Sequence, residues 1–289
     1  MAETSFHKPV AKIKRKKSLA QRLSENKAVQ QSSTIVLPVL LGVVIFALWQ
    51  TQVLHKMFGT DVFTLPLPTK IASLFAQNLP AVWTNSLATI KAAGLGLLFG
   101  SILGYVVAIL ATFFPDMGKG GLYLVGAFAS IPIAALAPVM NNWTKDVSST
   151  ASVRSMVSKI LVVTLVCAAD MTLNAYRGLT EVKPYSEDLM ATYAASKRKV
   201  LFKLRIPNSV PYIFTALKVS VPASIMTAVV SEYFAEYIVG VGREIRENIV
   251  LSQYSIAWVY ITAACIIGIV AYALLMLAQS ILMKKFKPV

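Results

Sequence analysis

Long apolar runs dominate the hydropathy pattern of this chain. Counting about 20 residues for each crossing of a bilayer, we predict six membrane-spanning helices. They cover residues 34–53, 87–113, 121–142, 157–177, 212–234 and 256–282. A polar, basic tail, residues 1–33, precedes the first run, and residues 34–289 form one membrane domain. The pattern therefore predicts an all-α integral membrane protein with no separate soluble domain.

The composition agrees with this class. Of the 289 residues, 56% are hydrophobic and only 14% are charged, whereas a soluble domain would be near a quarter charged. The net charge is +15, but Lys and Arg cluster at the ends of the apolar runs, as cytoplasmic flanks do, and this disfavours nucleic-acid binding. The two cysteines lie inside apolar runs, and the two histidines have no partners at ligand spacing. We therefore expect neither a metal nor a cofactor.

The placement of basic residues predicts that both termini face the cytoplasm. With this orientation, most of the 28 Lys and Arg residues fall in inner segments, as the positive-inside rule requires. Each tryptophan then lies at the outer end of a predicted span, where indole prefers the membrane interface. These residues are Trp49, Trp83, Trp143 and Trp258. Among the outer segments, we expect an amphipathic helix in residues 64–79, a flexible polar loop at 144–156 and a pair of short helices in 235–255.

One polar stretch between two apolar runs is unusual. Residues 188–207 read DLMATYAASKRKVLFKLRIP. The five basic residues place this stretch in water, yet apolar residues recur at helical spacing on both sides of the small-residue turn Ala194–Ala195–Ser196. Such an ordered, amphipathic, basic loop indicates a soluble partner that docks on the inner side of the membrane.

Small residues and prolines mark the helices that we expect at the centre. Within 87–113, small residues recur at every fourth position and form one stripe on a helix, which favours close helix packing. They are Ala92, Gly96, Gly100, Gly104 and Ala108. Pro132, Pro138 and Pro222 should kink their spans. Because breaks at bilayer depth occur only against protein or a water-lined cavity, these spans are candidates for the wall of a solute pathway.

Two acidic residues fall at membrane depth. Asp170 shares one face of the 157–177 span with Asn174 and Arg177. An acid in lipid is costly, so Asp170 should face the bundle interior, a partner or water. Two interpretations remain open: a polar pathway wall or substrate contact, and a structural pair with Asn174 or with a lysine of another span. Glu232, at the outer end of its span, has either a gating or a structural role.

Nothing in the sequence indicates an enzyme. We find no Ser-His-Asp, Cys-His or paired-carboxylate arrangement. The motif G-x-x-x-x-G-K-[ST] is also absent, so the chain cannot hold nucleotide phosphates in that way.

The polar loop resembles the E-A-A…G…I-x-L-P signature of permease subunits of bacterial ATP-binding-cassette importers. Asp188-Leu189-Met190 matches E-A-A, Ala194 stands at the glycine, and Ile206-Pro207 matches the closing pair. Because alanine replaces the glycine, we expect a turn without positive φ. The segments ASIPIAALAP (129–138), LNAYRGL (173–179) and VVSE (229–232) are similar to motifs of the nitrate, sulfonate and taurine branch, which also includes pyrimidine and riboflavin permeases.

The resemblance implies the six-helix type I importer permease fold in the bacterial inner membrane. Loop 184–210 would be a coupling helix that sits in a groove of a separate ATPase subunit and passes nucleotide-driven closure to the spans. The resemblance and the loop pattern assign coupling to Asp188, Leu189, Ala194, Ala195, Ser196, Lys197, Arg198, Leu201, Ile206 and Pro207. The implied partners are two ATPase copies, a second permease copy and an extracytoplasmic solute-binding protein.

The leading hypothesis is thus a homodimeric permease that imports a small solute by alternating access, with ATP hydrolysed by another chain. The solute would be an organic anion such as a sulfonate or nitrate-like ion, or a vitamin precursor. The pathway candidates are Asp170, Asn174, Glu232, Pro132 and Pro138. The alternative is an ion-coupled secondary transporter that works through Asp170. The elaborate basic loop and the absence of an obvious inverted repeat disfavour that alternative. A purely structural membrane anchor fits poorly with kinked spans and an intramembrane acid.

Overall fold

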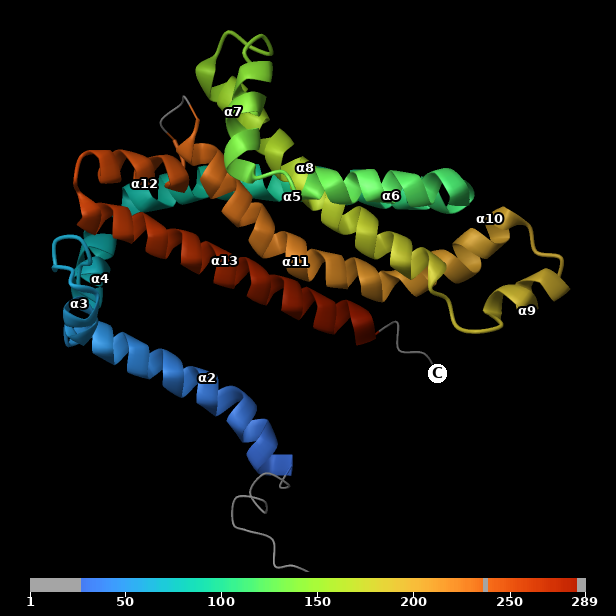
Figure 1. The fold of residues 1–289 in the computed structure, drawn as a ribbon, viewed down its shortest axis with the longest axis horizontal. Helices are drawn as coiled ribbons and strands as arrows, with labels where there is room; N and C mark the ends of the chain where they lie inside the picture. The colour runs from blue at the N-terminus through green and yellow to red at the C-terminus, as the bar shows by residue number, and fades with distance from the viewer. Residues whose placement is uncertain (1–26, 236–238, 285–289) are drawn as a thin grey trace, which may run out of the picture. The chain divides into compact units, whose positions relative to one another are not determined.

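A computed structural model describes residues 27–235 and 239–284. The described residues form helices joined by turns, with no strand among them. Contacts divide the chain into residues 1–60 and 61–289. In the first unit, α2 (Lys27–Gln50) is followed by the short α3 (Val53–Phe58), with Gln52 in the left-handed conformation between them (Figure 1). Most of the predicted basic tail, residues 1–26, lies outside the described residues.

The second unit contains the remaining described helices. In chain order they are α4 (Pro68–Gln77), α5 (Leu79–Phe113), α6 (Pro115–Ala129), α7 (Ile133–Trp143), α8 (Ala151–Thr180), α9 (Ser186–Thr192), α10 (Lys197–Val200), the π-helix η1 (Leu201–Arg205), α11 (Ile206–Tyr233), α12 (Val241–Val250) and α13 (Tyr254–Met283). Four helical segments of the described chain are long and apolar enough to cross a membrane: α5, α8, the continuous stretch Lys197–Tyr233 and α13. They coincide with four of the six predicted spans.

The other two predicted spans are helical but differ in form. The span 34–53 corresponds to the later part of α2, which ends at Gln50 and is followed by a turn. The span 121–142 is broken into α6 and α7, and α7 turns sharply away from α6 (Figure 1). The break falls at Ser130–Pro132, because proline lacks an N–H and disfavours the α conformation of the residue before it. The expected kink at Pro132 is therefore a complete interruption.

The segments between spans also depart in part from expectation. The amphipathic helix expected in residues 64–79 is present as α4. Between α11 and α13, the described residues form one short helix, α12, where we expected a pair. The polar loop expected at 144–156 is shorter, because α8 begins at Ala151.

Helices α5 and α8 pack backbone against backbone along the small-residue stripe. Ala92, Gly96, Gly100, Gly104 and Ala108 are all buried. A Cβ on Gly100 would lie 2.6 Å from the carbonyl oxygen of Thr164 and 2.7 Å from the Cβ of Cys167. A Cβ on Gly104 would overlap the carbonyl oxygen of Ala168. The stripe thus allows an approach that any larger residue would prevent.

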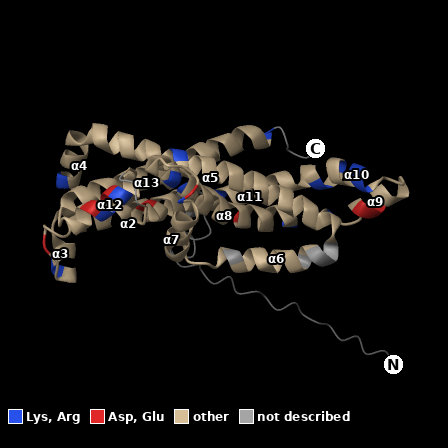
Figure 2. Ribbon diagram, turned by 90° about the horizontal axis from the view of Figure 1, so that it is seen from above, with Lys and Arg blue, Asp and Glu red and all other residues tan. Residues whose placement is uncertain are grey.

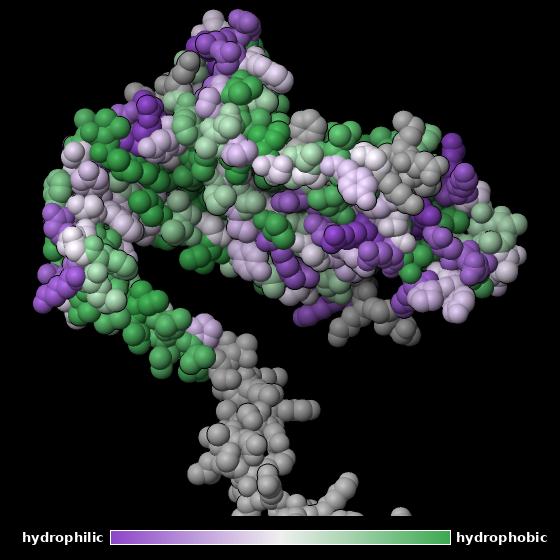
Figure 3. Space-filling model, in the orientation of Figure 1, coloured by the Kyte–Doolittle hydropathy of each residue, from purple (hydrophilic) through white to green (hydrophobic). Residues whose placement is uncertain are grey.

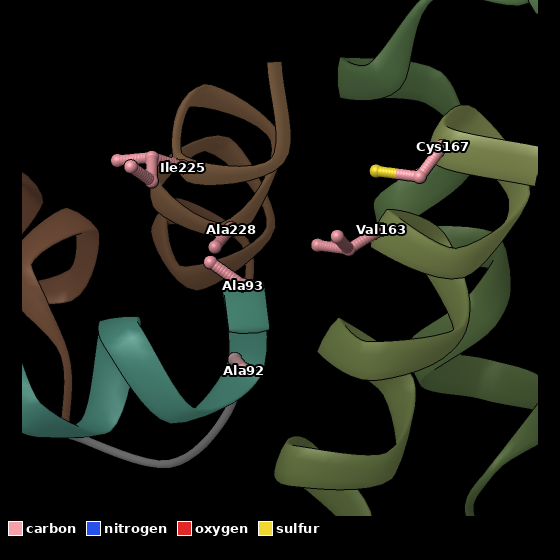
Figure 4. Packing of buried hydrophobic residues seen from close by; sticks show 6 residues of the cluster. All are labelled: Ala92, Ala93, Val163, Cys167, Ile225 and Ala228. Atoms are coloured by element: carbon pink, nitrogen blue, oxygen red, sulfur yellow. The ribbon is translucent and has the colours of Figure 1, made fainter. Parts of the chain in front are cut away.

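A core of small side chains joins α11 to this pair. Figure 4 shows Ala92 and Ala93 of α5, Val163 and Cys167 of α8, and Ile225 and Ala228 of α11 meeting in one cluster. All six are buried. Helices α5, α8 and α11 therefore form the packed centre that positions the remaining features of the second unit.

We predict that Gly100→Ala destabilises the protein, because its methyl group would meet the α8 backbone. Overpacking of this kind costs about 1–3 kcal/mol. Thermal unfolding of the detergent-purified protein measures the effect. Gly94→Ala is the matched control on the same helix, because a Cβ there meets no atom within 4 Å. Equal unfolding temperatures for the two variants would contradict close α5–α8 packing.

Candidate functional site

The polar loop 184–210 has a defined backbone. Helix α9 is bounded by two residues in the left-handed conformation, Tyr185 (φ 63) and Ala194 (φ 49). The expectation that alanine would avoid positive φ at position 194 is wrong. Backbone hydrogen bonds from Ala194 to Ala191 (2.9 Å) and from Ala195 to Met190 (3.0 Å) close this turn and offset a strain of about 1 kcal/mol. Ser196 then caps α10 by accepting a hydrogen bond from the N–H of Lys199.

The apolar residues of the loop separate into an exposed group and an anchored group. Leu189 of α9 and Tyr193 just after it are 58% and 77% exposed. Beside them, the side chains of Lys197, Arg198 and Lys199 are exposed as well. Figure 2 shows charged positions gathered on α9 and α10, and Figure 3 shows hydrophilic side chains at the same end of this unit. The loop thus presents a mixed apolar and basic surface.

The anchored group belongs to the helix core. Leu201 is buried in a cluster that continues the α5–α8–α11 packing toward the loop. Its other buried members are Ala108, Met171, Ala175, Leu179 and Ala216. Ile206 packs against this cluster, and Pro207 is at the start of α11. The second half of the loop is therefore part of the same packed body as the long helices.

Polar contacts tie the loop ends together. The amide of Asn208 donates to the carbonyl oxygens of Gly178 (2.8 Å) and Glu181 (3.0 Å) at the end of α8. Arg205 forms an ion pair with Glu187 of α9, with a shortest distance of 2.9 Å. Gly178 has no room for a side chain, because a Cβ there would lie 2.8 Å from the Cα of Ser209. These contacts join α9 to the start of α11 and the start of α11 to the end of α8.

A cleft lies between this loop and the end of α5. Its volume is about 320 Å³. It is lined by Thr112, Phe113, Glu187, Ala195, Lys197, Val200, Leu201 and Arg205. The cleft thus lies between the loop and a third long helix, besides the two that the loop connects.

A second polar cluster, the Glu232 network, is buried near the other end of α11. The Glu232 side chain is inaccessible to solvent. Its carboxylate accepts hydrogen bonds from the hydroxyl of Thr89 (2.9 Å) and the backbone N–H of Gly242 (2.9 Å). The ammonium of Lys159 lies 3.6 Å from the carboxylate and also donates to the carbonyl oxygen of Val239 (3.1 Å). A buried charge with these partners links α5, α8 and α11 to the start of α12.

The chain wraps tightly around this carboxylate. Gly240 has a φ of 128°, and a Cβ at this position would collide with the Glu232 side chain. Its N–H donates to Asn85 (2.9 Å), while the N–H of the next residue, Val241, donates to Thr89 (3.0 Å). Glycine is required here by the backbone conformation and by the contact. The network fixes the beginning of α12 against the long helices.

Sequence reasoning identified Glu232 but missed its partners. Lys159, near the start of the predicted span 157–177, is buried in α8. Asn85 and Thr89 stand four residues apart on α5, both buried. Polar residues at this spacing, at the start of an otherwise apolar helix, were the available signal, because they share one helix face.

Asp170 lies about two thirds of the way along α8, with its side chain partly buried. The hydroxyl of Ser220, on α11, donates to its carboxylate at 3.3 Å. Asn174 donates to the backbone carbonyl of Asp170 (2.9 Å) and not to the carboxylate. Within the described residues, the salt bridges are those of Lys159, Arg205 and Arg243. Neither of the structural pairs considered from the sequence, with Asn174 or with a lysine, is formed.

An apolar cavity of about 500 Å³ lies between α7 and α8, beside the helix break. It is lined by Ala129, Ile131, Pro132, Ile133, Leu136, Val139, Met140, Trp143, Leu165 and Val166. Asp170 stands one helical turn beyond Val166 on the same face of α8. Pro138 lies within α7, is exposed, and does not line the cavity. The described residues contain no group of His, Cys, Asp and Glu that could hold a metal ion.

Comparison with known proteins places these features in a family. The family described as "Binding-protein-dependent transport system inner membrane component" matches residues 33–288. The formylaminopyrimidine transport permease protein ThiX of Halalkalibacterium halodurans is 28% identical over 68% of this chain and 74% of its own length. The putative aliphatic sulfonates transport permease protein SsuC of Bacillus subtilis is 24% identical over 79% and 80%.

The fold has a counterpart among solved structures. A chain of the MetNI methionine ABC transporter, in an inward-facing conformation, superposes with a TM-score of 0.54 at 14% identity, over 73% of this chain and 96% of that chain. This likeness confirms the predicted all-α importer permease fold. Because the family match spans nearly the whole chain, from before the first predicted span to beyond the last, this protein belongs to the inner-membrane permease components of binding-protein-dependent, ATP-binding-cassette transport systems.

Proposed function

We propose that the chain imports a small solute by alternating access, driven by a separate ATPase that docks on loop 184–210. The observation that carries the proposal is the division of this loop into two parts. Leu189 and Tyr193 expose apolar surface beside three basic residues, whereas Leu201 is anchored in the core. Exposed apolar side chains on an ordered loop favour a protein partner. The anchored part would carry that partner's movement to α8 and α11.

The family supplies the remaining partners of the proposal. Its description names a binding protein, which would deliver the solute from outside. Two ATPase copies would act with two copies of this chain, because ATPases of this type work as pairs. Both termini would face the cytoplasm, as the distribution of Lys and Arg favours. Loop 184–210 would then be cytoplasmic, and the loop at 144–150 would face outward.

The pathway would run beside the cavity at the α6–α7 break. Discontinuous helices commonly form the solute sites of transporters. Pro132 lines this cavity, and Asp170 stands one helical turn beyond Val166, which also lines it. The relatives carry names that refer to an aminopyrimidine and to sulfonates. A vitamin precursor and an organic or inorganic anion are therefore both compatible with the family.

Glu232 would act as a positioning residue and not as a solute contact. Its carboxylate is buried and surrounded by protein donors, so a solute could reach it only after the network had opened. We propose that it holds the start of α12 against the spans.

The first prediction concerns docking. Leu189→Asp should abolish co-purification of the ATP-binding-cassette subunit of the same system and reduce uptake at least tenfold, because it places a charge in the proposed interface. The measurement is affinity purification in detergent together with uptake in cells. Val147→Asp is the control, since Val147 is 56% exposed in the loop at 144–150. Undiminished uptake by Leu189→Asp would overturn the proposal.

The second prediction concerns orientation. In a background with Cys167 and Cys265 replaced by Ala, Lys199→Cys should react with a membrane-impermeant maleimide only when the cytoplasmic face is accessible. Val147→Cys should react in intact cells. Intact cells and inverted membrane vesicles provide the comparison. The reverse pattern would mean that both termini face outward.

The third prediction concerns the Glu232 network. Glu232→Leu leaves the Lys159 charge buried without its partner and should lower the free energy of unfolding by about 3–5 kcal/mol. The double variant Lys159→Met/Glu232→Leu should be more stable than the single one. Glu247→Ala, which breaks the more exposed pair with Arg243, should cost less than about 1 kcal/mol. Thermal unfolding in detergent ranks the variants, and equal losses for Glu232→Leu and Glu247→Ala would refute the positioning role.

A further inference from the structure

We propose that Asp170, held in place by Ser220, forms a contact site for a solute that carries an amino or ammonium group, and that the pathway at this depth disfavours anions. The inference rests on the proposed import function and narrows its solute class. It follows from the position of one carboxylate, from the partners that this carboxylate has, and from the cavity beside it.

The surroundings of Asp170 differ from those of the enclosed acid Glu232. Its carboxylate receives one hydrogen bond in the described chain, from Ser220 at 3.3 Å. By contrast, the Glu232 carboxylate is enclosed by a hydroxyl, a backbone N–H and an ammonium group. The same helix bundle thus surrounds one intramembrane acid with donors and leaves the other with a single long hydrogen bond.

The exposed part of the Asp170 side chain cannot face lipid at low cost. Asp170 stands within α8, a 30-residue helix that is long and apolar enough to cross the membrane. A charged side chain at membrane depth is stable only when it faces a partner, the bundle interior or water. Because Ser220 supplies the one hydrogen bond that this carboxylate receives in the described chain, we take its remaining acceptor positions to face a space that water or a solute can enter.

The neighbouring surface has the character of a solute site. Leu165 and Val166 of α8 line the apolar cavity of about 500 Å³, and Val166 is one turn from Asp170. Small-molecule sites are mostly apolar cavities with a few placed polar groups. The Asp170 carboxylate supplies such a group one helical turn from the lining of this cavity. A carboxylate is an acceptor of N–H donors and repels sulfonate, nitrate and bicarbonate.

Thiol labelling tests the charge at this place without knowledge of the solute. Asn174→Cys and Val166→Cys place a thiol one turn on either side of Asp170, in the background with Cys167 and Cys265 replaced by Ala. Membranes that hold the complete transporter are treated with a cationic (trimethylammonium) or an anionic (sulfonate) methanethiosulfonate of similar size. The readout is the ratio of the two reaction rates, with each variant first checked for monodispersity in detergent.

We expect the cationic reagent to react faster at both positions, and Asp170→Asn to lower the rate ratio by about tenfold, as a unit charge some 6 Å away predicts in a water-filled space. Ser220→Ala should leave the ratio unchanged, because it removes a hydrogen bond but no charge. Val147→Cys, in the loop at 144–150, should show a ratio that does not respond to Asp170→Asn.

Two outcomes would overturn the inference. Equal rates for both reagents, or faster reaction of the anionic one, would show that the space carries no negative field. No reaction at either position would show that no aqueous path reaches Asp170. Either result leaves the import function intact, because docking of the ATPase is tested separately through Leu189. If uptake did not depend on docking of the ATPase but the cation preference remained, only the import proposal would be overturned.

Discussion

The close approach of α5 and α8 is the constraint on which the rest of the second unit depends. Gly100 and Gly104 let two long helices meet backbone to backbone, where a single methyl group would push them apart. In a membrane this contact cannot rely on the hydrophobic effect, since lipid is as apolar as leucine. Helices α5 and α8 therefore associate through the close fit of their surfaces. A helix pair fixed in this way provides a rigid frame for polar groups that would otherwise be costly at membrane depth.

Helix α8 brings the three polar features onto one element. Lys159 enters the Glu232 network near its beginning, Asp170 lies about two thirds of the way along it, and Gly178 accepts Asn208 at its end. The first and last of these are 19 residues apart in sequence, or roughly 28 Å along a helix. Because α8 is held against α5 over this length, one continuous helix joins the loop to the start of α12, with Asp170 between them.

The sequence was sufficient to predict the fold class and the loop, because both depend on the order of apolar and polar residues along the chain. Runs of apolar residues define α5, α8, α11 and α13, and a basic stretch with helical spacing defines loop 184–210. It was insufficient where a position depends on contacts across the fold. The burial of Lys159 depends on the Glu232 carboxylate 73 residues later in the chain. Proline at position 132 predicts a disturbed helix, but the hydropathy pattern does not determine whether the helix bends or is interrupted there.

Ala194 illustrates the same limit at a single backbone angle. Residue propensity argued against positive φ, yet the turn adopts it because Ala191 and Met190 supply the closing carbonyl groups. Local strain of this size persists only where the surroundings fix the conformation. Here the surroundings are α9 on one side and the capped α10 on the other, with η1 and the buried Leu201 beyond. A loop that is proposed to transmit movement from an ATPase to the membrane helices has to keep the conformation of its turns. The two closing hydrogen bonds of this turn and the cap of α10 restrain its backbone, and this restraint is compatible with the proposed role.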